Sequence, residues 1–349
     1  MGGRQATGER DTLTERHGAS RVVPVLAVIL LGSIFVAMTI GAYPVTLDGA
    51  LSALARLWSG ESPQSAEERV LLNIRGPRVL AGVVVGAALA GAGAVYQGLF
   101  RNPLVSPDIL GVSAGAGFGA VVGIFLSLPL AAIQGLAFVG GLATVTLVYA
   151  VASAVRGRDP TLVLVLGGVV VGALAGAGIS LLKILADPYD QLPAITFWLL
   201  GSLASTRGSE IASALPIVLV GLAPLILLRW RINVLSLGDE EAKSLGVEAG
   251  RVRTVVIAAA TLITASVVAI SGVIGWVGLV VPHIARMMVG PNFERLLPAS
   301  MLMGAAYLVL VDTLARSIAR IEVPIGILTA IVGAPFFLWL LWRGRHGWS

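Results

Sequence analysis

Residues 98–117, GLFRNPLVSPDILGVSAGAG, interrupt two long apolar segments of the chain. Pro103 and Pro107 lie four residues apart, and each lacks a backbone N–H and crowds the carbonyl four residues earlier. One regular helix cannot contain both prolines, so this stretch predicts a break between two helices. The apolar sequence on either side determines what kind of protein contains the break.

The composition is that of a membrane protein. The chain has 349 residues, of which 56% are hydrophobic and 12% are charged, and its mean hydropathy is +0.91. An ordinary soluble domain has about 25% charged residues. Apolar runs of about 20 residues, long enough to cross a bilayer, recur along the chain. They do not alternate every second residue, as the strands of a membrane barrel do. We therefore expect an all-α polytopic membrane protein.

The hydropathy pattern predicts about ten transmembrane helices of the usual length. Residues 186–211 are too interrupted for a span and predict a short half-helix at the membrane surface. The first apolar run is longer than the apolar region of a signal peptide, so we expect it to be retained. Residues 1–21 and 343–349 are then terminal tails on either side of one transmembrane domain, 22–342. The expected spans are 22–42, 78–98, 109–128, 134–154, 161–185, 212–229, 254–271, 273–289, 299–319 and 324–342.

The basic residues predict an orientation. With both termini in the cytoplasm, about two thirds of the 24 Lys and Arg residues lie on the cytoplasmic side, as the positive-inside rule requires. The net charge of +5 therefore reflects charges that flank spans, and no nucleic-acid partner is expected. The chain has no cysteine and three histidines, two of them in the tails. We expect no metal site, and interpret His283 as a packed histidine rather than a ligand.

Glycines recur at every fourth residue in three of the expected spans. Small residues at this spacing allow helix backbones to approach closely in lipid. Both static packing and a surface that slides during a transport cycle are compatible with the pattern. The three stripes are Gly82 and Gly86; Gly111, Gly115, Gly119 and Gly123; and Gly168, Gly172 and Gly176.

Two charged clusters occur near the outer ends of spans. Arg75 and Arg78 flank a helix start, where they oppose both the positive-inside rule and the helix dipole. An acidic partner outside the membrane, or lipid phosphates reached by snorkelling, would explain them. Asp312 and Arg316 lie four residues apart on one helix face and predict an intramembrane ion pair. That pair has either a structural or a transport role.

The cytoplasmic segment between the sixth and seventh spans contains LSLGDEEAKSLGVEAG, residues 235–250. Asp239 is a suitable N-cap, Glu240 and Glu241 suit the first turn, and Gly246 suits the stop. The resulting two-turn helix, with Ala242 and Leu245 on one side, is too short to be stable alone. We expect it to dock against the bilayer surface or a partner protein.

Several long motifs together resemble the FecCD-type permease subunit of ABC importers for iron–siderophore complexes, haem and vitamin B12. The resemblance extends from about residue 70 to 342, in order and with the family's spacing. It is carried by R-x-P-R at 75–78, GAALAGAGAVYQGLFRNPLVSPDILGVSAGAG at 86–117, LGDEEAKSLGV at 237–247, GVIGWVGLVVPHIARMMVG at 272–290, DTLAR at 312–316 and EVPIGILTAIVGAPFFLWLL at 322–341.

The resemblance implies a vitamin B12 permease-like fold in a bacterial inner membrane. It implies a homodimer with the pathway between the two permease subunits, and a periplasmic or lipid-anchored binding protein docked on Arg75, Arg78 and Arg316. Two cytoplasmic ATP-binding subunits would contact the coupling segment, and a cytoplasmic gate would narrow the pathway, although a plain turn explains the gate segment equally well. The coupling residues are Leu237, Gly238, Asp239, Glu240, Ala242, Leu245 and Gly246, and the gate residues are Asn102, Pro103, Leu104 and Thr161.

Energy source separates the alternatives. The chain contains no G-x-x-x-x-G-K-[ST] motif, so ATP and Mg²⁺ would be bound by the partner subunit, and we expect no cofactor and no catalytic residue here. A secondary transporter usually has ionisable residues near the midplane of several spans, and a membrane enzyme needs a cluster of reactive side chains. Neither pattern is present. An iron–siderophore complex is the expected substrate because such permeases form the largest group, with haem and cobamide as alternatives.

Overall fold

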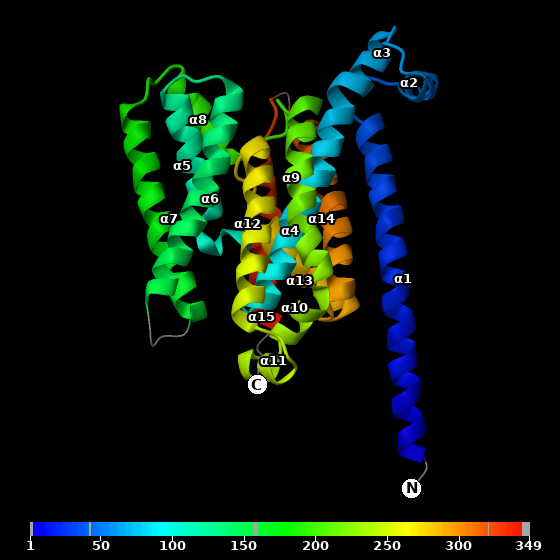
Figure 1. The fold of residues 1–349 in the computed structure, drawn as a ribbon. Helices are drawn as coiled ribbons and strands as arrows, with labels where there is room; N and C mark the ends of the chain where they lie inside the picture. Colours follow the sequence, from blue (N-terminus) through cyan, green and yellow to red (C-terminus); the bar gives the residue numbers. More distant parts are fainter. Residues whose placement is uncertain (1–2, 42, 156–159, 320, 344–349) are drawn as a thin grey trace.

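The computed structural model describes residues 3–41, 43–155, 160–319 and 321–343. Those residues fold into helices joined by short turns, and no strand occurs among them (Figure 1). The helices are α1 Gly3–Thr39, α2 Leu47–Ser59, α3 Ala66–Arg69, α4 Gly76–Leu99, α5 Val112–Phe125, α6 Leu130–Ala154, α7 Pro160–Leu185, α8 Gln191–Leu200, α9 Gly208–Leu227, α10 Arg229–Leu235, α11 Asp239–Ser244, α12 Ala249–Ser271, α13 Val277–Val289, α14 Phe293–Ala315 and α15 Ile325–Arg343; a π-helical turn η1, Val70–Arg75, precedes α4, and a 3-10 turn η2, Pro107–Leu110, precedes α5.

Each of the ten predicted spans coincides with one helix, so the fold class is confirmed. The ten are α1, α4 to α7, α9 and α12 to α15. Seven of the described helices are long and apolar enough to cross a membrane, whereas α5, α13 and α15 are shorter apolar helices. The predicted half-helix is α8, whose Ile195 is fully buried. Most boundaries differ by a few residues, and the largest difference is that α1 begins at Gly3, so the polar N-terminal residues extend the first helix.

The helices form two groups that meet at α12, which also packs against α5 and α6 (Figure 1). In one group α4 packs against α12, α13 and α14, and α9 packs against α12. In the other, α5 packs against α6, α7 and α8. Helix α1 lies at the opposite edge of the molecule and packs mainly on α14. The start of α1, helix α11 and the end of α15 lie at the same end of the molecule.

The glycine stripes on α4 and α5 are close helix–helix contacts. A Cβ at Gly86 would lie 2.2 Å from the carbonyl oxygen of Gly304 on α14, and one at Gly119 would lie 2.1 Å from that of Leu136 on α6. Of the three stripe glycines on α7, only Gly168 is this tightly packed, while a Cβ at Gly176 would meet nothing within 4 Å. Close packing therefore explains the stripes on α4 and α5, and only the start of the stripe on α7.

The interrupted stretch forms a re-entrant turn. After α4 the chain reverses and returns to the bundle interior, where η2 packs beside α7 and α13. A Cβ at Gly278 of α13 would lie 2.5 Å from Pro107 and 2.9 Å from the carbonyl oxygen of Leu89, so η2 lies at the depth of the middle of α4. Surrounding protein makes irregular backbone tolerable at this depth. Because the chain spends part of its crossing in this turn, α5 needs only 14 residues.

Candidate functional site

Arg78 is the centre of a charged cluster at the end of the molecule opposite α11. Its Nη2 lies 2.7 Å from Oδ1 of Asp312 and 2.5 Å from Oε1 of Glu322, and its Nε lies 2.8 Å from Oδ2 of Asp312. Asp312 is only 2% exposed. Arg316 is a weaker partner, since its Nε is 4.0 Å from Oδ2 of Asp312. The predicted pair of Asp312 and Arg316 is therefore part of a larger network in which Arg78, from a different helix, neutralises Asp312.

Arg75 and Arg316 cap the last turn of α1. Nη1 of Arg75 donates to the carbonyl oxygens of Met38, at 2.6 Å, and Thr39, at 3.2 Å, and Nη2 of Arg316 donates to that of Ala37. The last carbonyls of a helix have no partner within the helix and carry the negative end of its dipole. The two guanidinium groups satisfy both requirements, and they attach the end of a helix that otherwise has few buried side chains.

These contacts correct the expectation that the arginines are exposed. Arg75 is 3% exposed and Arg78 is 8% exposed, and both are hydrogen-bonded within the chain. Arg316 is partly buried. Their placement against the positive-inside rule has an internal explanation, because Arg78 neutralises the buried Asp312 while Arg75 and Arg316 donate hydrogen bonds to helix-end carbonyls. A docking role for them stays a prediction.

The coupling segment, residues 235–250, contains α11 and follows α10, and the two helices connect α9 to α12. Gly238, with φ of +137°, takes the N-cap position expected for Asp239, whose carboxylate instead binds Arg253 of α12 at 2.8 Å. Gly246, with φ of +76°, ends the helix as predicted. Ala242 is fully buried in its own chain, which is inconsistent with the expectation that it contacts a partner.

The exposed residues of the coupling segment are the ones at its two ends and on its acidic face. Leu237 is 60% exposed and Leu245 is 52% exposed, and Glu240 is exposed between them. Two hydrogen bonds attach α10, which precedes this segment, to the start of α14. The Nδ2 of Asn233 donates to Oδ1 of Asn292, and the N–H of Phe293 donates to Oδ1 of Asn233 at 2.7 Å. The exposed side chains of Leu237 and Leu245 are therefore presented by a segment that is anchored to the rest of the chain.

The predicted gate residues lie in two places. Asn102 is in the turn after α4, where its Oδ1 accepts the N–H of Leu104 at 2.9 Å and its own N–H donates to the carbonyl of Gln97 at 3.1 Å. Pro103 follows it in the same turn. Thr161 is in the first turn of α7. These hydrogen bonds account for a stable turn by themselves, and a gating role stays a prediction.

The turn after α4 also approaches the coupling segment. A Cβ at Gly238 would lie 3.7 Å from Nη1 of Arg101, a residue with φ of +49°. The side chain of Arg101 therefore lies close to the N-cap of α11. Within the described ranges, no three His, Cys, Asp or Glu side chains come together as a metal site, and His283 is partly buried on α13.

Comparison with known proteins identifies the family to which the chain belongs. The model of the FecCD transport family matches residues 29–343. The chain is a member of the FecCD transport family. Relatives of this FecCD permease include the molybdate permease MolB of Haemophilus influenzae, 38% identical over 92% of this chain and 95% of MolB, and the cobalamin permease BtuC of Halobacterium salinarum, 45% identical over 80% of this chain and 74% of BtuC.

Two further comparisons agree with this assignment. A probable iron chelatin permease of Helicobacter pylori is 43% identical over 79% of this chain and 83% of its own. A solved structure described as a metal-chelate type ABC transporter, in an inward-facing conformation, matches with a TM-score of 0.84 and 37% identity, and covers 93% of this chain and 99% of that one. The FecCD permease is thus a membrane subunit of an ABC importer and not itself an enzyme.

Sequence reasoning missed two carboxylates of this permease. Glu322, which binds Arg78, lies in the loop between α14 and α15, ten residues beyond Asp312. Asp108, in η2, accepts a hydrogen bond from the hydroxyl of Ser113 in the first turn of α5. Asp108 was available as part of the Ser-Pro-Asp sequence at the helix break, but nothing in the sequence indicated that Glu322 meets a residue of α4.

Proposed function

We propose that two copies of this permease enclose the pathway of an importer that carries an iron–siderophore complex into the cytoplasm. The observation that carries the proposal is the surface of α7. Only 11% of the most apolar part of this helix is buried within the chain, the smallest share among the seven long apolar helices. Val169, Leu174 and Ile184 are 61%, 67% and 81% exposed. A helix with so little contact to its own chain is available to a second copy and to the pathway between the copies.

The composition of α7 favours a chelate over a bare oxyanion. Residues 161–182 contain no charged side chain, and Lys183 is the first one, near the outer end. An oxyanion such as molybdate would need hydrogen-bond donors or positive charge along its path, because an unpaired anion is costly in an apolar environment. A chelate surrounds the metal's charge with an organic shell and needs fewer such contacts. Haem and cobamide share this property and are the alternatives.

The energy and the substrate would come from partner proteins at opposite ends. Two cytoplasmic ATP-binding subunits would receive Leu237 and Leu245 of the coupling segments. The start of α1, helix α11 and the end of α15 lie at one end of the molecule (Figure 1), and we infer from this that both termini are in the cytoplasm of a bacterium and that the charged cluster is on the outer side. A periplasmic or lipid-anchored binding protein would dock there, near Arg316, the least buried of the three arginines.

Uptake by the reconstituted permease–ATPase complex tests the substrate. Proteoliposomes would be offered labelled ferric siderophore, haem, cobalamin and molybdate side by side, each with its binding protein. We expect ATP-dependent accumulation of the ferric siderophore alone. Uptake of molybdate would refute the inference from α7, and uptake of haem or cobalamin would replace the siderophore by that chelate.

Crosslinking tests the dimer. The chain has no cysteine, so a single introduced cysteine reports one position. Leu174→Cys on α7 should give a disulfide-linked dimer in the membrane, whereas Leu219→Cys, 55% exposed on α9, should not. Cysteines at Asn102 or Leu104 should crosslink in a nucleotide-dependent way if these residues form the gate. Equal crosslinking at Leu174 and Leu219 would show random collision and count against an interface at α7.

A further inference from the structure

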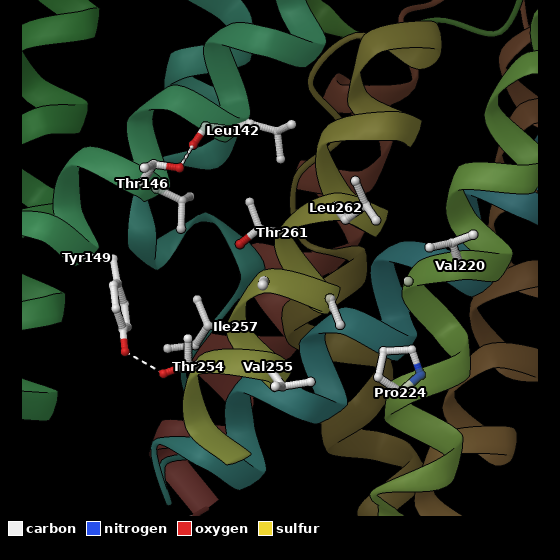
Figure 2. A pocket seen from close by; sticks show the side chains of 14 residues that line it. Leu142, Thr146, Tyr149, Val220, Pro224, Thr254, Val255, Ile257, Thr261 and Leu262 are labelled. Carbon is white, nitrogen blue, oxygen red and sulfur yellow. Dashed lines mark hydrogen bonds between the residues drawn. The ribbon is translucent and has the colours of Figure 1, made fainter. Parts of the chain in front are cut away.

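A cavity of about 560 Å³ lies on the face of α12, between α6 on one side and α9 on the other (Figure 2). It is formed by three membrane-crossing helices of the FecCD permease and is separate from the charged cluster and the coupling segment. Its lining residues are Leu142, Val145, Thr146 and Tyr149 of α6; Val220, Gly221 and Pro224 of α9; and Thr254, Val255, Ile257, Ala258, Ala259, Thr261 and Leu262 of α12.

The lining is mainly apolar, and each of its hydroxyl groups already makes a hydrogen bond within the chain. The hydroxyls of Tyr149 and Thr254 are 2.5 Å apart and bridge α6 to α12 (Figure 2). Thr146 donates to the carbonyl of Leu142, and Thr261 pairs with Tyr96 at 3.1 Å. A water molecule needs two to four polar partners to occupy a cavity stably, and the few hydroxyls here have already used at least one hydrogen bond each within the chain. The cavity is therefore suited to an apolar occupant.

A second hollow lies farther along the same three helices, toward the other end of the molecule. Its volume is about 250 Å³, and it is lined by Phe138 of α6, Ile217 of α9 and Ser266 of α12, among others. The two hollows lie one after the other along α6, α9 and α12. Side chains around an unfilled space lose their dispersion contacts, so an elongated apolar groove at this depth favours a linear hydrocarbon chain.

Positive charge lies at the end of the groove nearest α11. Arg251 is one helical turn before Thr254, its side chain is 84% exposed, and its described ion pair is with Glu248, at 3.1 Å on the surface. Surface pairs of this kind contribute little. Arg231, in α10 directly after α9, is exposed as well. These residues complement a phosphate held at the membrane surface.

We propose that this groove binds an acyl chain of an anionic phospholipid, with the headgroup phosphate at Arg251 and Arg231. The lipid would come from the leaflet on the α11 side. It would fill the space between α6, which belongs to the group of α5 to α8, and the helices that pack on α4. The inference depends on the membrane location of the chain and not on the substrate proposed above.

Native mass spectrometry of the purified full-length permease tests the site, with dioleoyl phosphatidylglycerol as the probe and dioleoyl phosphatidylcholine as the neutral comparator. Ala258 lines the groove and is exposed to it, so Ala258→Trp fills the space. Ala223→Trp is the matched control, since Ala223 is exposed on α9 and is not among the lining residues. Wild type should bind one tightly held phosphatidylglycerol per chain.

We expect Ala258→Trp to weaken that binding by at least about tenfold, which is the cost of losing about two buried methylene groups of the lipid. Ala223→Trp should bind the lipid as wild type does. Arg251→Glu should weaken phosphatidylglycerol binding by at least about fivefold and leave phosphatidylcholine binding unchanged. Ala258→Leu, with an intermediate effect, covers the case in which the Trp variant does not fold.

Unchanged phosphatidylglycerol binding by the folded Ala258 variants would overturn the proposal. A shift from dimer to monomer without loss of lipid would also overturn it, because it would identify a second copy as the occupant. If the Ala258 variants lose the lipid and even the wild-type complex takes up no ferric siderophore, the lipid groove is supported and the proposed substrate is rejected.

Discussion

Replacing Arg78 by Leu should destabilise the folded chain strongly. Arg78 makes its hydrogen bonds to two carboxylates, and Asp312 is 2% exposed. Without Arg78 the nearest cation to Asp312 is Arg316, whose Nε is 4.0 Å from Oδ2. Removing one partner of a buried ion pair costs about 3–5 kcal/mol because the remaining charge is uncompensated. The residual contact with Arg316 puts our expectation at the lower end, about 3 kcal/mol.

The thermal midpoint in detergent, followed by loss of the monodisperse peak in size-exclusion chromatography, measures this effect. A free-energy change of 1 kcal/mol shifts the midpoint by roughly 2 °C in large domains, so Arg78→Leu should lower it by about 6 °C. The double variant Arg78→Leu with Asp312→Leu should recover at least about half of the loss, since no buried carboxylate is then left unpaired. Arg69→Leu, at an exposed arginine in α3, is the control and should leave the midpoint unchanged.

A different result would refute the reasoning. If Arg78 is chiefly a docking residue, Arg78→Leu will keep the wild-type midpoint and will slow association of the binding protein in a salt-dependent way. If the midpoint falls but the double variant falls further, the loss comes from packing around the guanidinium and not from the unpaired carboxylate. Only a fall in the single variant with recovery in the double supports Arg78 as the internal partner of Asp312.

Three further predictions follow from close packing, exposure and ionisation. Gly86→Val should abolish folding, because a Cβ there would lie 2.2 Å from the carbonyl oxygen of Gly304, while Gly176→Val should be tolerated; yield of monodisperse protein distinguishes them. Leu245→Asp should leave the permease folded but lose the ATPase on co-purification, and full retention would contradict a docking role for this 52% exposed side chain. A hydrogen bond from the N–H of Gln64 is the main cause that lowers the pKa of Glu68 to about 2, and Arg56 contributes. Because this pKa lies below the ordinary value, the ionised Glu68 stabilises the α2–α3 segment above about pH 4.5, and that stabilisation is lost as the pH falls toward 2. Limited proteolysis between pH 5 and 2.5 should show this loss in wild type, and a Glu68→Gln variant should show equal cleavage at both pH values.

Hydrophobic length and helix-breaking residues were sufficient to predict the number and position of the spans. Each run of about 20 apolar residues must satisfy its backbone hydrogen bonds within itself in lipid, so a span is encoded locally. The break at Pro103 and Pro107 was local information of the same kind. The motifs also carried the family resemblance, because they occur in order along the chain. Gly246 as a helix stop was predictable as well, since its positive φ is a property of one residue.

The charged cluster and the groove were decided by tertiary structure. Asp312 has Arg316 one turn away in sequence, yet Arg78, on a helix far away along the chain, is at 2.7 Å because α4 and α14 approach through Gly86 and Gly304. Sequence spacing identifies which residues can meet on one helix, but only the crossing of two helices brings distant charges together. The same holds for Ala242, which is small enough to pack inward although its position in the helix suggested an exposed contact. A cavity is the space that packed helices leave between them, so no single segment of sequence encodes it.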